Sequence, residues 1–182
     1  VRSVIFSSAD LPTLVLDADA LNILAKTPRW GQEVPSDAVL TPHPREMARL
    51  TGLSVAEIQS KRMSIAREVA HSWQKTVVLK GAYTVVAAPD GKASINPMAN
   101  PGLASAGNGD VLAGAIAGLV AQGSSLFNAA VSGVFLHSQA GELVKKEMGD
   151  AGMLASDLLP ILPLVISEIK GKTVQPERLI GG

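Results

Sequence analysis

Three short apolar runs most constrain the fold of this chain. They lie at residues 13–16, 39–41 and 76–79 and are rich in Val, Leu and Thr. Continuous apolar runs of this length are typical of strands that are buried on both sides in a parallel sheet. Helical stretches separate them, as parallel neighbours require. The alternation predicts an α/β fold with a mostly parallel central sheet and helices on both faces.

Helix signals fill the intervals between these strands. We expect helices at residues 20–26, from Pro44 to a stop at Gly52, and from the capping box Ser54-Val-Ala-Glu57 to residue 75. The last should bury Trp73 and place Arg62 on a solvated face. Residues 27–37 contain two prolines and a glycine and should form a loop.

The connection between strands should change after residue 79, because a hairpin signal replaces the strand-helix-strand pattern. A fourth strand is expected at 84–88, a turn at 89–92 and a fifth strand at 93–96. Helices should follow from Asp110 to about residue 123, over 128–148 with a packed His137, and from a cap at Ser156 or Asp157 to residue 169. Gly114 and Gly118 should let the first of these helices pack closely on the sheet. The stretch 1–10 should be a frayed strand or helix end.

The totals favour one folded domain over residues 1–182. Apolar residues make up 47% of the chain, and no internal repeat or linker divides it. The sixteen acidic and sixteen basic residues cancel, which argues against general nucleic-acid or membrane binding. The chain has no cysteine, which excludes disulfides and thiolate chemistry and fits a cytoplasmic protein. It begins with Val1, so we expect it to lack the N-terminal part of its domain.

A loop of small residues, Ala106-Gly-Asn-Gly-Asp110, leads directly into an apolar helix. The first turn of a helix has free backbone N–H groups and a partial positive charge, so this loop would suit a phosphate. Asp110 could then remove a proton from a hydroxyl that attacks phosphorus. The alternative is that Asp110 is only the N-cap of a tight connection. The loop is not a P-loop, and Leu112 replaces the third glycine of a dinucleotide fingerprint.

Polar residues follow three of the expected strands, at the edge where open α/β sheets bind ligands. Asp17, Asp19 and Asn22 follow the first strand, and either aspartate could instead cap the next helix. His43 is held between two prolines after the second strand, where a structural role is as probable as a functional one. Lys80 follows the third and could meet a phosphate or remain solvated.

The blocks around these residues resemble a known family. Five of them, in the same order, are similar to those of the ADP-dependent NAD(P)H-hydrate dehydratases, which are ribokinase-like enzymes. The blocks are Leu16-Asp-Ala-Asp-Ala-Leu-Asn22, Leu40-Thr-Pro-His-Pro-Arg-Glu46, Leu79-Lys-Gly-Ala-Tyr-Thr84, Ala106-Gly-Asn-Gly-Asp-Val-Leu-Ala-Gly114 and Ala155-Ser-Asp-Leu-Leu-Pro160. Asn108 stands where Thr or Ser is common, which is tolerable if the loop acts through its backbone.

The resemblance implies a repair reaction with two substrates, NAD(P)H hydrate and ADP. ADP would phosphorylate the hydroxyl of the hydrated nicotinamide ring, and loss of phosphate would restore NAD(P)H. Mg²⁺ would be held by the phosphates and water, without a dedicated protein cage. The resemblance also implies a homo-oligomer, and a second chain could supply the missing N-terminal part. Two other readings stay open: a thiazole or hydroxymethylpyrimidine kinase, and an inactive nucleotide-binding fragment.

Residue roles follow from the same resemblance. Asp110 would be the catalytic base and would also contact the substrate, and His43 would bind the hydrated nicotinamide nucleotide. The amides of Gly107, Asn108 and Gly109 would hold the transferring phosphoryl group. The adenine nucleotide would be bound, mostly through backbone, by Lys80, Gly81, Ala82, Tyr83, Thr84 and Gly109.

Overall fold

The computed structural model describes residues 11–34 and 37–171, so the expectation for residues 1–10 lies outside it. Its centre is a five-stranded sheet in which the strands lie side by side in sequence order. The strands are β1 (Leu14–Leu16), β2 (Ala38–Leu40), β3 (Thr76–Leu79), β4 (Val85–Ala87) and β5 (Ala93–Ile95).

The sheet is parallel on one side and antiparallel on the other. β1 pairs in parallel with β2, and β2 with β3, with Leu14 opposite Ala38 and Val39 opposite Thr76. β3, β4 and β5 then form antiparallel pairs. The change of direction expected after residue 79 is therefore confirmed. The β4–β5 turn closes through Asp90, whose Oδ1 accepts a hydrogen bond from the Lys92 backbone at 3.0 Å.

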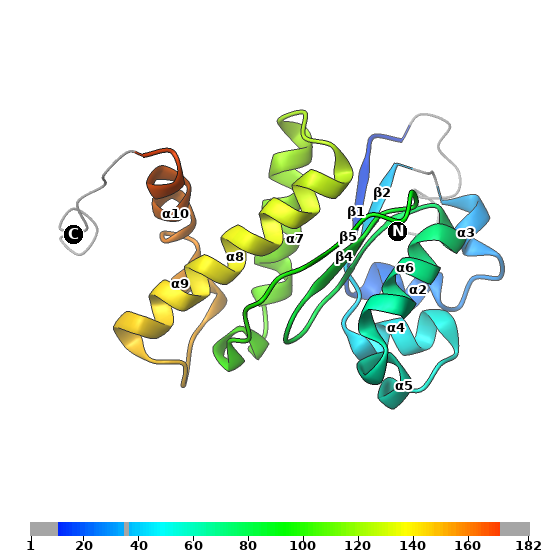
Figure 1. Cartoon of the computed structure of the whole chain (residues 1–182), viewed down its shortest axis with the longest axis horizontal. Helices are drawn as coiled ribbons and strands as arrows, with labels where there is room; N and C mark the ends of the chain where they lie inside the picture. Colours follow the sequence, from blue (N-terminus) through cyan, green and yellow to red (C-terminus); the bar gives the residue numbers. More distant parts are fainter. Residues whose placement is uncertain (1–10, 35–36, 172–182) are drawn as a thin grey trace.

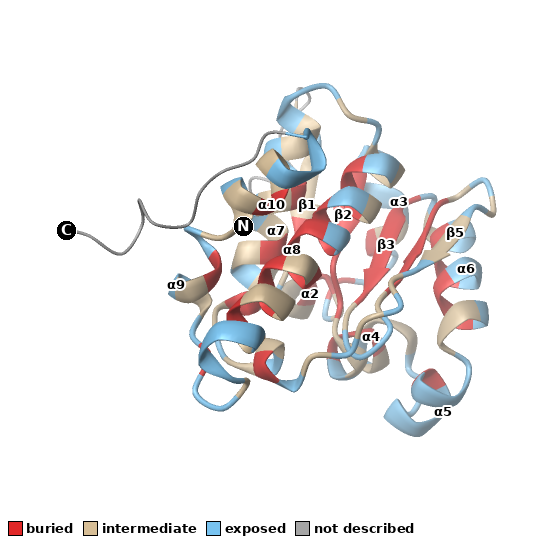
Figure 2. Ribbon diagram, turned by 60° about the vertical axis from the view of Figure 1, so that its left-hand side comes forward, coloured by how far each residue is buried: buried red, intermediate tan, exposed pale blue. Residues whose placement is uncertain are grey.

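Helices cover both faces of the sheet, as the alternating pattern predicted (Figure 1). Side chains alternate along each strand, so Val77 and Leu79 face one layer and Val78 faces the other. One layer holds α2 (Asp19–Leu24), α3 (Trp30–Glu33), α4 (Pro44–Thr51), α5 (Val55–Ser60) and α6 (Arg62–Trp73). The other holds α7 (Asn108–Ala121) and α8 (Leu126–Met148), which follow the 3-10 turn η1 (Pro101–Ala104). The central strands and the inner faces of these helices are buried (Figure 2).

Several expectations about the helices were wrong. The segment 27–37 was expected to be a loop, but it contains α3, because Trp30 packs on Trp73 with ring centroids 4.8 Å apart. The helix expected over 54–75 is two helices, α5 and α6, separated at Lys61, whose φ of −131° is not helical.

The last expected helix is also divided, into α9 (Ala155–Leu158) and α10 (Leu162–Ile169), with Pro160 between them. Proline has no N–H to continue the hydrogen-bond ladder. Both pieces pack against α8 on its side away from the sheet (Figure 1). Within the described ranges, no helix combines the length and the hydropathy that crossing a membrane would require.

The glycines that permit close packing belong to α8 instead of α7. Gly114 and Gly118 are exposed, and a Cβ at either would meet nothing within 4 Å, so their expected role was wrong. A Cβ at Gly133 of α8 would lie 2.6 Å from Cγ1 of Ile116, and one at Gly141 would lie 2.8 Å from Leu103. These two glycines bring α8 against α7 and η1.

This difference predicts opposite effects of one substitution at two helical glycines. Gly133→Ala should lower the free energy of unfolding by about 1–3 kcal/mol, because the new methyl group overpacks the contact with Ile116. Gly114→Ala should raise it by up to about 1 kcal/mol, because the site is open and alanine favours helix. Urea denaturation of both variants measures the two shifts, and shifts in the same direction would contradict the packing described.

Candidate functional site

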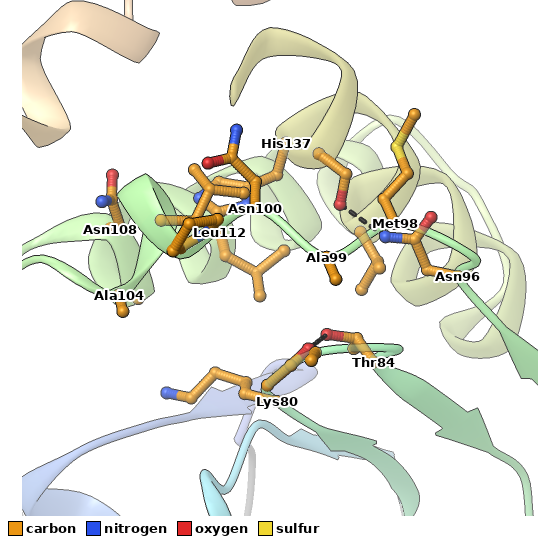
Figure 3. A pocket seen from close by; sticks show the side chains of 17 residues that line it. Lys80, Thr84, Asn96, Met98, Ala99, Asn100, Ala104, Asn108, Leu112 and His137 are labelled. Carbon is orange, nitrogen blue, oxygen red and sulfur yellow. Dashed lines mark hydrogen bonds between the residues drawn. The ribbon is translucent and has the colours of Figure 1, made fainter. Parts of the chain in front are cut away.

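A cavity of about 390 Å³ lies between the end of β3 and the helices of the opposite layer. Figure 3 shows Lys80 and Thr84 on one side of it and Asn108, Leu112 and His137 on the other. The lining residues come from the β3–β4 connection, the β5–η1 segment, α7 and α8: Lys80, Gly81, Ala82, Thr84, Asn96, Met98, Ala99, Asn100, Pro101, Leu103, Ala104, Asn108, Gly109, Leu112, Val134, His137 and Ser138.

The N-terminus of α7 opens onto this cavity without a side-chain cap. Gly107 is the N-cap residue, with a φ of +87° that favours glycine, and no side chain accepts from the first turn. The first intrahelical donor is the Val111 amide, which reaches the Gly107 carbonyl at 3.2 Å. The amides of residues 108–110 therefore precede the helical ladder. Three such donors and the positive end of a fourteen-residue helix form an anion site.

The side chain of Asn108 turns away from that role. Only 2% of the residue is exposed, and its Nδ2 donates a hydrogen bond to Ser105 Oγ at 2.7 Å. This bond holds the loop between η1 and α7 in place. The side chain at position 108 thus serves the loop through its Nδ2, and its backbone amide is free for a ligand.

Asp110 is the third residue of α7 and not its cap, so the helix begins two residues earlier than expected. Its side chain is exposed, and it forms no ion pair or hydrogen bond with any residue in the described ranges. A carboxylate in the first turn interacts favourably with the helix dipole. The carboxylate therefore remains available to a ligand at the helix end.

Lys80 lies in a cluster of charges directly beside the start of α7. Its Nζ is 2.5 Å from Asp17 Oδ1 and 3.9 Å from Glu46 Oε2. A Cβ on Gly109 would be 3.3 Å from both Lys80 Nζ and Asp17 Oδ2. The glycine thus lets the ion pair approach the helix end closely. Two positive features, the ammonium group and the helix terminus, meet at one point of the cavity.

His43 is the N-cap of α4. Its Nδ1 accepts from the amides of Arg45 and Glu46 at 3.1 and 3.2 Å, and Glu46 Oε2 accepts from the His43 amide at 2.8 Å. Because Nδ1 accepts, the proton of the neutral ring is on Nε2. That nitrogen is 3.4 Å from Glu46 Oε1, and 43% of the side chain is exposed. His43 does not line the cavity, but Glu46 connects it to Lys80.

Asp19 and Asn22 join two helices and do not face the cavity. Arg49 donates to Asn22 Oδ1 at 2.7 Å, which links α4 to α2, and Asn22 donates to Asp19 at 3.4 Å. Neither Asp17 nor Asp19 caps α2, because its N-cap is Ala18 and no side chain accepts there. Of the three polar residues after β1, only Asp17 reaches the candidate site.

Four of the five residues expected to bind the nucleotide after β3 line the cavity. Tyr83 is the exception, because it has a positive φ of 56° and is 55% exposed. Thr84 Oγ1 donates to the Gly81 carbonyl at 2.8 Å and closes the turn (Figure 3). Arg62 reaches the same turn from α6 and donates to the Leu79 and Lys80 carbonyls at 2.8 and 3.1 Å. The expectation of a solvated Arg62 was wrong, and burial lowers the pKa of its guanidinium.

Sequence reasoning treated His137 as a packed residue and missed its place in the wall of the cavity. The side chain comes from α8, beside Val134 and Ser138 on the face turned to the sheet. Burial lowers the pKa of His137 to about 4; the Asn108 backbone carbonyl opposes the shift and the Lys80 ammonium adds to it. The ring is therefore neutral near pH 7. The apolar neighbours of His137 in the sequence indicated only a buried helix. Its place in the cavity wall could not be predicted from them, because the cavity is formed by segments distant in the sequence.

Comparison with known proteins identifies the family. Residues 4–164 match the family described as NAD(P)H-hydrate dehydratase. The chain is 49% identical over 156 residues to the bifunctional NAD(P)H-hydrate repair enzyme of Moorella thermoacetica, an alignment that covers 86% of the chain and 29% of that protein. It is 46% identical over 151 residues to the ADP-dependent (S)-NAD(P)H-hydrate dehydratase of Neisseria meningitidis, covering 81% and 51%.

The structure is also similar to a solved one. It matches the ADP/ATP-dependent NAD(P)H-hydrate dehydratase of Bacillus subtilis, co-crystallised with ATP and Mg²⁺, with a TM-score of 0.75 and 41% identity. That match covers 85% of this chain and 55% of the other. The chain thus spans about half the length, or less, of the relatives it matches. The matches in sequence and structure agree with the five sequence blocks: this chain belongs to the NAD(P)H-hydrate dehydratase family and has its ribokinase-like α/β fold.

Proposed function

We propose that the complete protein carrying this chain uses ADP to dehydrate NAD(P)H hydrate. The observation that carries the proposal is the meeting of Lys80 with the uncapped start of α7 at one end of a nucleotide-sized cavity. The activities named for the relatives from Neisseria meningitidis and Bacillus subtilis support the same reaction. We propose a part of the reaction for each group below.

The cavity would bind ADP with its phosphates at the Lys80 end. An ammonium group and free helix amides are charge-assisted donors for phosphate oxygens. The far end, where Figure 3 shows Met98 beside Asn96, would take the base. The β3–β4 turn, held by Arg62, forms the wall along which the nucleotide would lie.

The reaction would proceed by phosphoryl transfer and elimination. The ring hydroxyl attacks the β-phosphorus of ADP, Asp110 accepts the hydroxyl proton, and AMP leaves. The free amides of residues 108–110 would stabilise the charge on the transferring group. The C–O bond then breaks, phosphate departs with the electron pair, and a proton lost from the adjacent ring carbon restores the double bond. The products are NAD(P)H, AMP and phosphate.

The nicotinamide substrate would approach from the side of His43, whose capping bonds fix the Nε2–H toward Glu46. Mg²⁺ would supply charge neutralisation at the phosphates. The described residues contain no group of three or more His, Cys, Asp or Glu that could hold an ion. Asp17 and Glu46, the carboxylates beside Lys80, already pair with it, so phosphate oxygens and water would provide the ion's main ligands.

We also propose that the protein is a cytoplasmic homo-oligomer. Large apolar side chains are exposed at the end of α8 (Met148), on either side of α9 (Leu154 and Leu159) and at the end of α10 (Ile169). Such a surface is typical of contacts between subunits. Light scattering after size-exclusion chromatography measures the mass, and a monomer at micromolar concentration would contradict this part of the proposal.

The proposed activity is tested by incubating the complete protein with hydrated NADH, ADP and Mg²⁺. We expect the absorbance of the reduced nicotinamide to return, with one AMP formed for each NADH. Boiled protein and reactions without nucleotide serve as controls. No recovery with ADP or ATP, together with phosphorylation of a thiazole or hydroxymethylpyrimidine alcohol, would show that the chain is a kinase of a different substrate.

The role of Asp110 gives a second test. Asp110→Asn should reduce turnover by at least ~100-fold, the scale of a lost general base, while the dissociation constant for ADP changes little. Asp90→Asn, in the exposed β4–β5 turn, removes the same charge away from the cavity and should keep full activity. A collapse of ADP binding in Asp110→Asn, measured by calorimetry, would mean that Asp110 only supports the loop.

The role of Lys80 gives a third test, which depends on the length of the ligand. Lys80→Met should weaken ADP binding by roughly 10- to 100-fold, the value of a charged hydrogen bond, and leave adenosine binding almost unchanged. Lys92→Met is the matched control, because Lys92 is exposed in the β4–β5 turn. Equal weakening of ADP and adenosine would place Lys80 away from the phosphates.

A further inference from the structure

The cavity contains an unusual concentration of unpaired polar atoms. Four buried side-chain polar atoms in the described part of the chain have no hydrogen-bond partner, and three of them belong to residues that line this cavity. They are Asn100 Nδ2, Asn108 Oδ1 and His137 Nε2. A buried polar group without a partner is costly, so each such group needs an explanation, of which a missing ligand is one.

His137 is the strongest of the three. Its residue exposure is only 7%, and its ring reaches the cavity wall from the middle of α8. No hydrogen bond within the described residues involves Nε2. Asn108 already uses its amide nitrogen to hold Ser105, and Asn100 already accepts from the Gly102 amide at 2.9 Å. Those two side chains have a role in the loop, and the imidazole is held at the Asn108 backbone carbonyl, but its Nε2 has no partner that the fold explains.

The position of His137 along the cavity identifies what it would meet. Figure 3 shows His137 between Asn108 and Lys80 toward one end and Asn96 and Met98 toward the other. The Asn108 carbonyl and the Lys80 charge both act on the imidazole, so the ring stands next to the phosphate end. In a nucleotide, the group that follows the phosphates and precedes the base is the ribose.

We propose that His137 Nε2 forms a hydrogen bond with a ribose hydroxyl of the nucleotide bound in this cavity. This proposal rests on the proposed function, which assigns the cavity to ADP. A hydroxyl both donates and accepts, so it pairs with a neutral imidazole in either tautomer. The exocyclic amine of adenine only donates, and it belongs to the far end of the cavity. His137 would therefore make the site selective for nucleotides that carry ribose hydroxyls over 2′,3′-dideoxynucleotides.

The neutral state of the ring supports this role. A cationic imidazole at this position would lie near the Lys80 ammonium and would be buried, and both effects disfavour it. The ring therefore remains a neutral hydrogen-bonding group throughout the physiological range of pH. It can contribute selectivity without adding a third positive feature to the phosphate end.

The test measures ribose selectivity in the complete protein by calorimetry. Wild-type protein should bind ADP about 10-fold or more tightly than 2′,3′-dideoxy-ADP, because the deoxy ligand leaves Nε2 unpaired. His137→Leu, which has similar volume and no polar atom, should bind the two ligands about equally. His137→Gln should restore part of the preference for ADP. His71→Leu is the matched control, because His71 is exposed on α6 and lies outside the cavity.

Four results would overturn the proposal. His137→Leu could keep the full preference for ADP over the dideoxy ligand, which would mean that Nε2 meets only water. It could instead lose the preference for ADP over inosine diphosphate, which would place the base amine at His137. Wild-type protein could bind ADP and the dideoxy ligand equally, which would refute the ribose contact but leave the proposed function intact. If no adenine nucleotide bound at all, the proposed function would fail together with this inference.

Discussion

The contact between the Lys80–Asp17 ion pair and the first turn of α7 is the constraint on which the site depends. Lys80 follows β3, Asp17 follows β1, and Gly109 lies in the first turn of α7, so three segments that are distant in the sequence are in contact here. An ammonium group beside the positive end of a helix is unfavourable without an anion. Asp17 supplies that anion in the free protein. A bound phosphate would bring further negative charge, and the amides of α7 and the Lys80 ammonium group would both bind it.

The packing around this contact fixes where α7 begins. Gly133 allows α8 to approach Ile116 of α7, and Gly141 allows it to approach Leu103 of η1. The two elements that flank the loop before α7 therefore both pack on α8. Asn108 closes the loop through Ser105. The amides at the helix start are thus preorganised before a ligand arrives, which is the condition for effective electrostatic stabilisation of a transferring group. Glu46, which accepts a hydrogen bond from the His43 amide in the cap of α4, also pairs with Lys80 and so connects this cap to the site.

Much of this arrangement could be predicted from the sequence, because its signals are local. The apolar runs predicted the strands, and the turn residues after β4 predicted the hairpin. Of the polar residues after β1 and β2, Asp17 contacts Lys80, whereas Asp19, Asn22 and His43 do not line the cavity. The errors have a common cause in long-range packing. Gly114 and Gly133 look alike as helical glycines, and only the neighbouring helix distinguishes them. Arg62 and His137 resemble a surface and a core residue until the β3–β4 turn and the cavity are seen beside them.

The most direct test of the central claim is a crystal structure of the complete protein with ADP and Mg²⁺. We expect phosphate oxygens within hydrogen-bond distance of the amides of residues 108–110, Lys80 Nζ in contact with the phosphates, and the base at the end of the cavity near Met98. Phosphates bound away from the start of α7, or a nucleotide outside this cavity, would contradict the central claim.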